Sequence, residues 1–184
     1  MVTVRDLKDL VVLVDEQDVP IGTRGKMDVH RSGELHRAFS VFVFDPQDRL
    51  ILQQRALGKY HSGGLWTNTC CSHPRPGEAL ADAAARRLRE EMGILCQGIE
   101  HQFSFIYRAE VGNGLVEHEL DHVLFARHSG DVRPDPREAM AWRAVTDEEL
   151  DHELRTGPDR FTAWLKSCWP LVKERRGAGL RHAV

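Results

Sequence analysis

The sequence has no long apolar run, and its longest purely apolar stretches cover only a few positions. Since a helix that crosses a bilayer needs about 20 mostly apolar residues, this absence excludes a transmembrane helix. The amino-terminal stretch MVTVRDLKDL carries charges where a signal peptide needs its apolar segment. We therefore expect a cytoplasmic protein without a membrane partner.

A strong charge of either sign is also missing, because the formal net charge is only -3. This balance gives no electrostatic reason to expect nucleic acid or an anionic membrane as the main partner. An anionic small molecule would have to be held by a local cluster of basic side chains.

Cysteine is scarce, and the four residues are Cys70, Cys71, Cys96 and Cys168. Neighbouring cysteines almost never pair with each other and the other two have no framework spacing, so we expect reduced thiols. Repeats, linkers and low-complexity segments are absent as well. With 41% hydrophobic residues the chain can bury a core. We predict a single domain over residues 1–176 and a frayed, basic tail over residues 177–184.

Residue patterns place several elements. β-Branched and aromatic residues predict a strand over residues 38–44, which a turn joins to residues 50–54 in a hairpin. A polar loop with a glycine hinge should precede it over residues 28–36. A helix should run from about residue 78 to Gly93, a good left-handed cap. A long strand should cover residues 115–127.

Three further elements follow the same rules. A short strand is expected over residues 66–71, ending before Pro74. Thr146 begins a capping box, which predicts the start of a helix. A last helical segment should cover residues 158–175.

The helix after residue 78 has an apolar stripe with a spacing of four, formed by Leu80, Ala84, Leu88 and Met92. Glu91 falls on the edge of this stripe, and Arg87 lies one turn before it. A simple i,i+4 salt bridge would explain this pair. However, the carboxylate also faces the strand that carries Cys71, where a cation or donors must offset its desolvation.

Glu117 and Glu119 are two residues apart on a predicted strand, so both side chains leave the same face. Alternation alone leaves open whether that face is solvated or buried. Two adjacent carboxylates repel each other unless a proton or a metal lies between them. Together with His30, His36 and His73 they would suit a divalent transition metal such as zinc or manganese.

Basic residues lie in or near the same segments, namely Lys26, Arg55, Lys59 and Arg87. Each alone is typical of solvated surface, but together they would form a phosphate or diphosphate site. Cys71 is either a small buried residue or an acid–base group whose pKa a neighbouring histidine or metal lowers. Cys70 should point to the opposite face of the strand, and its role stays open.

The segment over residues 72–94 resembles the Nudix box, with matches at Glu78, Arg86, Leu88, Glu90, Glu91, Gly93 and Ile94. Ser72 replaces the initial glycine of that motif, and Arg87 replaces the first glutamate of its catalytic pair. Hydrolytic members use that glutamate for metal-assisted attack on a diphosphate, so its loss counts against hydrolysis.

The wider pattern, over roughly residues 10–170, resembles the type 1 isopentenyl-diphosphate isomerases of the Nudix superfamily. The matching pieces are LHRAFS from Leu35, QRA from Gln54, WTN from Trp66 with CSHP from Cys71, YRA from Tyr107, EHE from Glu117, and Phe161 with Trp164. The resemblance implies an α+β fold of the Nudix type, α/β/α sandwich-like, with a mixed central sheet flanked by helices. It also implies an enzyme that interconverts isopentenyl and dimethylallyl diphosphate in isoprenoid biosynthesis.

The resemblance implies a role for each matching residue. One divalent metal, manganese or zinc, would be bound by His30, His36, His73, Glu117 and Glu119. Magnesium on the substrate diphosphate would be held by Glu91 and by the backbone carbonyl of Cys71. Diphosphate contacts would come from Lys26, Arg55, Lys59 and Arg87. The catalytic residues would be Cys71 and Glu119, with Tyr107 assisting and Trp164 stabilising a carbocation.

Three other functions stay open beside the isomerase. A Nudix diphosphohydrolase would release phosphate, although Arg87 argues against it. A non-catalytic diphosphate-binding module would not need Cys71 or Glu119, and both are present. A cysteine hydrolase would need an orienting residue for His73, and none can be assigned. The expected partner is a small molecule, and a homodimer is left open.

Overall fold

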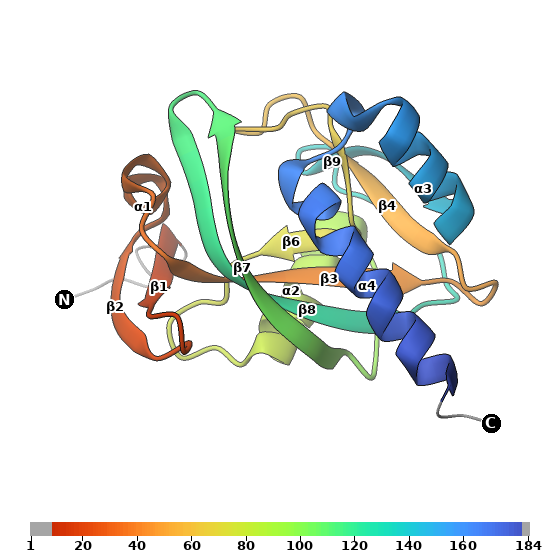
Figure 1. Cartoon of the computed structure of the whole chain (residues 1–184), viewed down its shortest axis with the longest axis horizontal. Coiled ribbons are helices and arrows are strands. Elements are labelled where there is room, and N and C mark those ends of the chain that lie inside the picture. Colours follow the sequence, from red (N-terminus) through yellow and green to blue (C-terminus); the bar gives the residue numbers. More distant parts are fainter. Residues whose placement is uncertain (1–8, 182–184) are drawn as a thin grey trace.

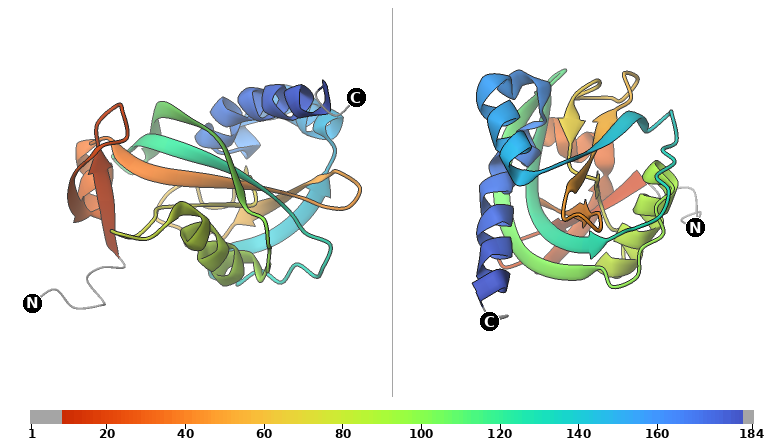
Figure 2. Two further views of the ribbon diagram at one scale, coloured as in Figure 1. Left: turned by 90° about the horizontal axis from the view of Figure 1, so that it is seen from below. Right: turned by 90° about the vertical axis from the view of Figure 1, so that its right-hand side faces the viewer.

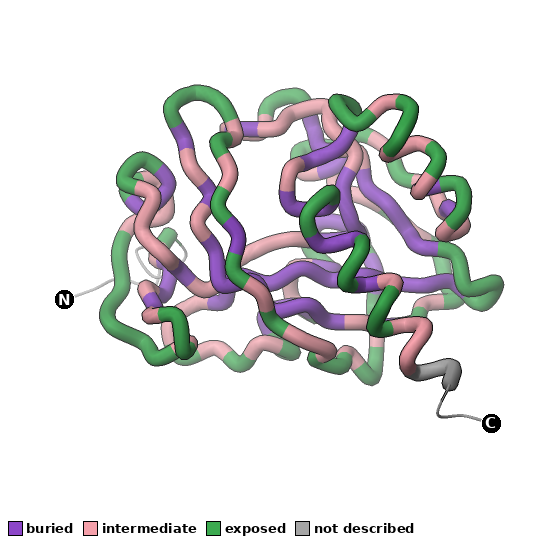
Figure 3. Tube along the Cα trace, in the orientation of Figure 1, coloured by how far each residue is buried: buried purple, intermediate pink, exposed green. Residues whose placement is uncertain are grey.

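Strand β3 (His36–Phe44) lies at the centre of the fold and is buried along almost its whole length. In the computed structural model, which describes residues 9–181, β3 pairs in parallel with β8 (Leu115–Arg127). It also pairs antiparallel with the short β6 (Cys70–Ser72). Because aromatic and β-branched side chains leave both faces of β3, the strand needs cover on both sides, and Figure 3 shows its trace buried.

The described residues form one mixed nine-stranded sheet and four α-helices, which confirms the predicted α+β fold. In chain order the elements are β1 (Leu10–Val14), β2 (Pro20–Gly25), α1 (Lys26–Ser32), β3, β4 (Leu50–Arg55), β5 (Trp66–Thr67), β6, α2 (Leu80–Met92), β7 (Glu100–Gly112), β8, β9 (Ala139–Val145), α3 (Asp147–Thr156), a 3-10 turn (Pro158–Arg160) and α4 (Ala163–Arg181).

Helices cover the two faces of the sheet (Figures 1 and 2). Helix α2 packs on one face, where Leu88 and Met92 join a core cluster with residues of β3 and β8. Helix α4 lies on the other face, where Leu165 and Trp169 join a second cluster with β3 and β4. Strands β1 and β2 and helix α1 form one end of the molecule (Figure 1).

Helix α2 confirms the sequence pattern closely. It ends at Gly93 in the left-handed conformation, with φ of 64°. A Cβ at that position would lie 2.6 Å from the Arg133 carbonyl oxygen, so the residue must be glycine for two reasons. The stripe of Ala84, Leu88 and Met92 is fully buried. The long strand β8 and the capping box of Thr146 are confirmed as well.

The predicted loop over residues 28–36 was wrong, because most of it is helix α1, capped by Gly33 at a positive φ. Val29 and His30 on its inner side are fully buried, and that burial stabilises a helix too short to be stable alone. The predicted hairpin between β3 and β4 is present, but its ladder is short. Only Phe44 and Leu50 pair, and β4 also pairs with β9 and β5.

The ends of two predicted elements differ as well. The strand expected over residues 66–71 divides into β5 and β6, because Asn68 and Thr69 turn inward to bond the backbone of neighbouring strands. Helix α4 continues past Gly177, where the frayed tail was expected to begin. In the part of the chain described, no helix has the length and apolar character to cross a membrane.

Candidate active site

Three histidines and two glutamates that are far apart in the sequence meet beside the first residues of strand β3. Helix α1 supplies His30, the start of β3 supplies His36, and the chain after β6 supplies His73. Strand β8 supplies Glu117 and Glu119 from one face, opposite Tyr107 of β7. Both glutamates are buried, so the alternative that they lie on a solvated face is wrong.

The ring nitrogens of these histidines converge on one point. His36 Nδ1 lies 2.9 Å from the Glu34 carbonyl and His30 Nδ1 lies 2.7 Å from the Lys26 carbonyl. These contacts fix each Nδ1 as the protonated nitrogen, which turns each Nε2 lone pair toward the centre. His36 Nε2 is 3.2 Å from His73 Nε2, which is 3.0 Å from Glu119 Oε1.

This donor set suits a divalent metal. Ligand atoms of His30, His36, His73 and Glu119 all lie within 4.8 Å of one another. Buried His30 Nε2 has no hydrogen-bond partner among the described residues, which is costly unless it binds a ligand. Burial lowers the pKa of His30 to about 4 and that of His73 to about 3, so both are neutral at pH 7, as metal ligands must be.

The two carboxylates of β8 have different environments. The Tyr107 hydroxyl donates to Glu119 Oε2 at 2.6 Å and lies 2.9 Å from Glu117 Oε2. Burial and the charge of Glu119 raise the pKa of Glu117 well above its usual range. Burial also opposes ionisation of Glu119, but contacts with His36 and His73 outweigh it and hold its pKa well below that range. The two environments therefore favour the protonated form of Glu117 and the ionised form of Glu119.

His61 is a further residue of the site, and it was not predicted from the sequence. This residue is buried, and its Nε2 lies 3.2 Å from Glu117 Oε1. His30, His61 and Glu117 form a second group of converging donors next to the first. In the sequence His61 lies in a basic loop between Lys59 and the strand that begins at Trp66, and this position was the sole signal for its role.

Cys71 lies at the opposite side of β3, on β6. Its thiol donates to Asn68 Oδ1 at 2.9 Å and lies 3.6 Å from Ser40 Oγ, whose hydroxyl donates to buried Asp121 at 2.7 Å. Burial, followed by the charge of Asp121, raises the pKa of the Cys71 thiol. The thiol is therefore a proton donor at pH 7 rather than a thiolate. Its neighbour Cys70 points into the core, as predicted.

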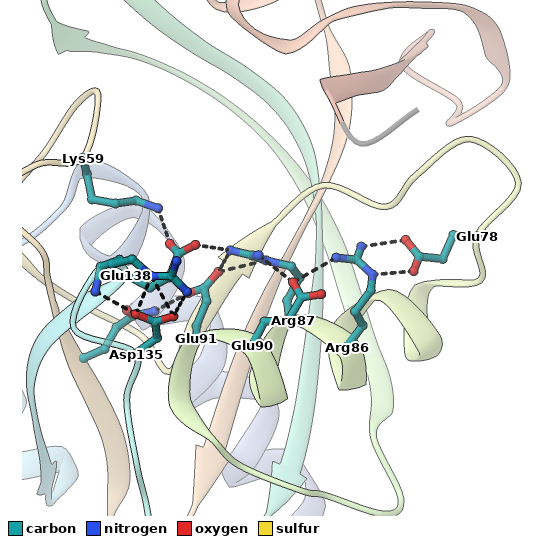
Figure 4. Close-up of polar contacts among 10 residues, drawn as sticks. Lys59, Glu78, Arg86, Arg87, Glu90, Glu91, Asp135 and Glu138 are labelled. Carbon is teal, nitrogen blue, oxygen red and sulfur yellow. Dashed lines mark hydrogen bonds and ion pairs between the residues drawn. The ribbon is translucent and has the colours of Figure 1, made fainter. Parts of the chain in front are cut away.

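Glu91 of helix α2 lies at the edge of the same site. Arg87 Nη2 donates to Glu91 Oε1 at 2.6 Å, and Gln53 Nε2 donates to Glu91 Oε2 at 3.0 Å. Figure 4 shows that Arg87 Nη2 also reaches Glu138, which accepts from Lys59 at 2.5 Å. The simple salt bridge between Arg87 and Glu91 is therefore present. Two cations, Arg87 and Lys59, therefore lie beside the carboxylates of Glu91 and Glu138.

The remaining predicted residues line the same cavity. Burial lowers the pKa of Lys26, whose ammonium lies 4.7 Å from the Tyr60 ring centroid. The Arg55 guanidinium lies 5.1 Å from the Trp164 ring centroid. The cavity measures about 40 Å³, and its walls include Lys26, Arg55, Lys59, Cys71, His73, Arg87, Glu91, Tyr107, Glu117, Glu119 and Trp164. Buried acids, neutral imidazoles and cations thus face one small space, an arrangement that can bind a metal, hold an anion and transfer protons.

Comparison with known proteins gives the class first. Residues 34–165 match the family model of the NUDIX domain. A solved structure from Deinococcus radiodurans shares this fold with a TM-score of 0.72, although it is only 17% identical over 88% of this chain and 97% of its own.

Closer relatives give the family within that class. An "Isopentenyl-diphosphate Delta-isomerase 2" of Aromatoleum aromaticum is 53% identical over 94% of this chain and 93% of its own length. An "Isopentenyl-diphosphate Delta-isomerase 1" of the same organism is 56% identical over 88% and 91%. The chain therefore belongs to the isopentenyl-diphosphate Delta-isomerases of the NUDIX class. The prediction of an isomerase rather than a diphosphohydrolase is confirmed at this level.

Proposed function

We propose that the chain interconverts isopentenyl diphosphate and dimethylallyl diphosphate by adding a proton to one carbon and removing a proton from another. The observation that carries this proposal is the pair of proton-bearing groups on either side of β3. The Cys71 thiol comes from β6, and the Tyr107–Glu119 pair comes from β7 and β8. Moving an unactivated double bond needs an acid and a base that reach the substrate from different sides.

The metal site belongs to the same proposal. His30, His36, His73 and Glu119 would hold one divalent ion, manganese or zinc, with Glu117 as a further ligand. When bound, such an ion supplies positive charge that keeps the glutamate cluster ionised and polarises the groups it binds. The residues themselves position the Tyr107 hydroxyl, which already donates to Glu119 at 2.6 Å.

Four cations would bind the diphosphate. Arg87 and Arg55 offer planar forks that match phosphate oxygens, whereas Lys26 and Lys59 offer point charges. Arg87 and Lys59 now donate to Glu138, so we expect the diphosphate to compete for those bonds. Glu91 would hold a magnesium ion on the diphosphate, together with the backbone carbonyl of Cys71.

Protonation of the alkene leaves a tertiary carbocation. The ring of Trp164 is 2% exposed and lines the cavity, so it can offer a π face while excluding water. The cavity of about 40 Å³ is well below the roughly 300 Å³ at which ligand pockets begin. We therefore expect side chains around Trp164 and the Tyr60–His61 loop to move when substrate enters.

A deuterium experiment tests the activity. The protein with magnesium and isopentenyl diphosphate in D2O should yield dimethylallyl diphosphate carrying deuterium, followed by NMR. Release of phosphate, or no product with no deuterium uptake, would contradict the proposal.

Variants test the two proton-bearing groups. Cys71→Ala and Glu119→Gln should each lower kcat by roughly 10²- to 10⁴-fold, which is the usual contribution of acid–base catalysis. Cys96→Ala, at a half-buried thiol outside the cavity, should keep full activity. Full activity in either site variant would remove that residue from the mechanism.

Other expectations about the whole protein also remain proposals. They are a cytoplasmic location, the absence of nucleic-acid and membrane partners, and a single domain over residues 1–176, while assembly as a homodimer stays open.

A further inference from the structure

A third group of polar side chains lies on the other face of β7 and β8, away from the two groups of the cavity. His101 Nε2 is 3.2 Å from His122 Nδ1. The Ser104 hydroxyl oxygen is 3.0 Å from the first nitrogen and 2.9 Å from the second. Glu119 and His122 differ by three positions along β8, so their side chains leave opposite faces and this group is separate from the cavity described above.

A β-bulge brings these residues together. Ser104 stands directly opposite His122 in the β7–β8 register, while His101 stands opposite Leu124. In a regular strand His101 and Ser104, three positions apart, would leave opposite faces. The register shift between His101 and Phe103 restores His101 to the face of Ser104. Bulges commonly turn a side chain in this way beside a functional site.

The other ring nitrogen of His122 faces a carboxylate. His122 Nε2 lies 3.1 Å from Asp18 Oδ2, while Asp18 Oδ1 accepts from Arg37 Nε at 2.7 Å. A carboxylate behind an imidazole is the usual outer partner of a metal-binding histidine, because it fixes the tautomer that leaves the other nitrogen free. Burial lowers the pKa of His122, which favours the neutral imidazole that a metal requires.

We propose that His101 and His122, with the Ser104 hydroxyl hydrogen-bonded beside them, form a surface site for a divalent transition metal of the zinc class. Zn–N bonds of about 2.0–2.1 Å at a tetrahedral angle place two ligand nitrogens about 3.3–3.4 Å apart, close to the separation seen here. Imidazole nitrogens suit zinc, copper and nickel, whereas magnesium and calcium prefer oxygen. His101 and Ser104 are exposed, so water can complete the coordination.

The proposed ion would join three parts of the chain. Its ligands come from β7 and β8, and Asp18 belongs to the turn between β1 and β2. Asp18 already bonds Arg37 at the start of β3. Binding would therefore fix the bulged end of β7 against the β1–β2 turn without contact with the catalytic cavity.

Zinc uptake by the full chain tests the site. The protein is saturated at its inner site and dialysed against a series of Zn²⁺ concentrations, and the metal per chain is measured. Wild-type protein should take up one ion more per chain than His101→Ala. Losing a ligand should weaken this uptake by more than the roughly 10- to 100-fold that outer-shell changes cause. His101 is exposed, so its removal should leave the fold and the turnover unchanged.

Two further measurements make the test specific. His152→Ala removes an exposed histidine from α3 and should bind zinc like the wild type. Amide NMR shifts on adding the extra zinc should centre on residues 101–104, 122 and 18. Equal uptake by wild type and His101→Ala would overturn the proposal. So would an equal loss in His152→Ala, because the uptake would then be unspecific.

Discussion

At the scale of single residues, Arg87 decides how the NUDIX helix is used. Its guanidinium lies between Glu90, Glu91 and Glu138 and donates to all three. A glutamate here would add a fourth carboxylate to a row that already holds three. The arginine offsets the charge of that row, and in the proposed function its fork would bind the diphosphate that a hydrolase would attack.

Arg87→Gln should raise KM far more than it lowers kcat. A hydrogen bond to a charged group contributes about 1.5–3 kcal/mol, which corresponds to a loss of about 10- to 100-fold in kcat/KM. Arg87→Lys keeps the positive charge without the planar fork, so its KM should lie between that of the wild type and that of Arg87→Gln. Arg89→Gln, an exposed neighbour on α2, is the matched control for steady-state kinetics. An unchanged KM in Arg87→Gln would show that Arg87 does not contact the diphosphate.

Residue chemistry made much of the candidate site predictable, since carboxylates two apart on a strand and scattered histidines suggest a metal. The histidines and glutamates come together only because β3 and β8 pair in parallel with His36 opposite Glu119. No local sequence pattern predicts this register. Other residues of the site could not be predicted for the same reason. Ser40 and Asp121 looked like ordinary strand residues, and His61 like a loop residue, because only the folded chain places them beside Cys71 and Glu117.

At the scale of elements, long periodic segments were predictable and short ones were not. Helix α2 carries its own stripe and cap, so local sequence defined it. Helix α1 has seven residues, and burial of Val29 and His30 against the rest of the fold stabilises it. The predicted hairpin pairs only next to its turn, because β6 and β8 occupy the two edges of β3 further along the strand.

Helices α3 and α4 are joined by a polar clamp at Asp151. Its carboxylate accepts from Trp169 Nε1 at 2.8 Å and from Lys173 Nζ at 2.6 Å. Burial opposes ionisation, but these two bonds outweigh it and lower the pKa of Asp151 below its usual value. Because the group is partly exposed, we expect Asp151→Ala to lower the free energy of unfolding by only about 1 kcal/mol at pH 7.

The pH dependence of this effect has a definite sign. A carboxyl whose pKa is lowered by folding stabilises the protein above its unfolded pKa of about 4 and loses that contribution as pH falls through the folded value. The difference between wild type and Asp151→Ala, measured by urea unfolding, should therefore shrink below about pH 4. Asp159→Ala, at an exposed position, should show little difference at any pH. A difference that grows in acid would contradict this account.

At the scale of the whole molecule, the proposed metal ligands come from segments that are distant in the chain. His30 comes from α1, His36 from β3, His73 from the loop after β6, and Glu119 from β8. Without an ion, several buried nitrogens face one another and His30 Nε2 has no partner in the described part of the chain. A ligand that binds only the folded state stabilises it by about 2.7 kcal/mol at 100 times its Kd.

Chelation should therefore lower the Tm of the wild-type protein by several degrees, and added manganese or zinc should restore it. His36→Gln removes one inner ligand and should abolish most of this response, because the remaining donors no longer surround the ion. His101→Ala removes only the proposed outer site and should keep most of it. These two variants separate the sites in calorimetry: a response that disappears with His101 but survives loss of His36 would assign the stabilising ion to the outer face of the sheet. The inner histidines would then stabilise the fold only through the contacts they make with one another and with Glu119.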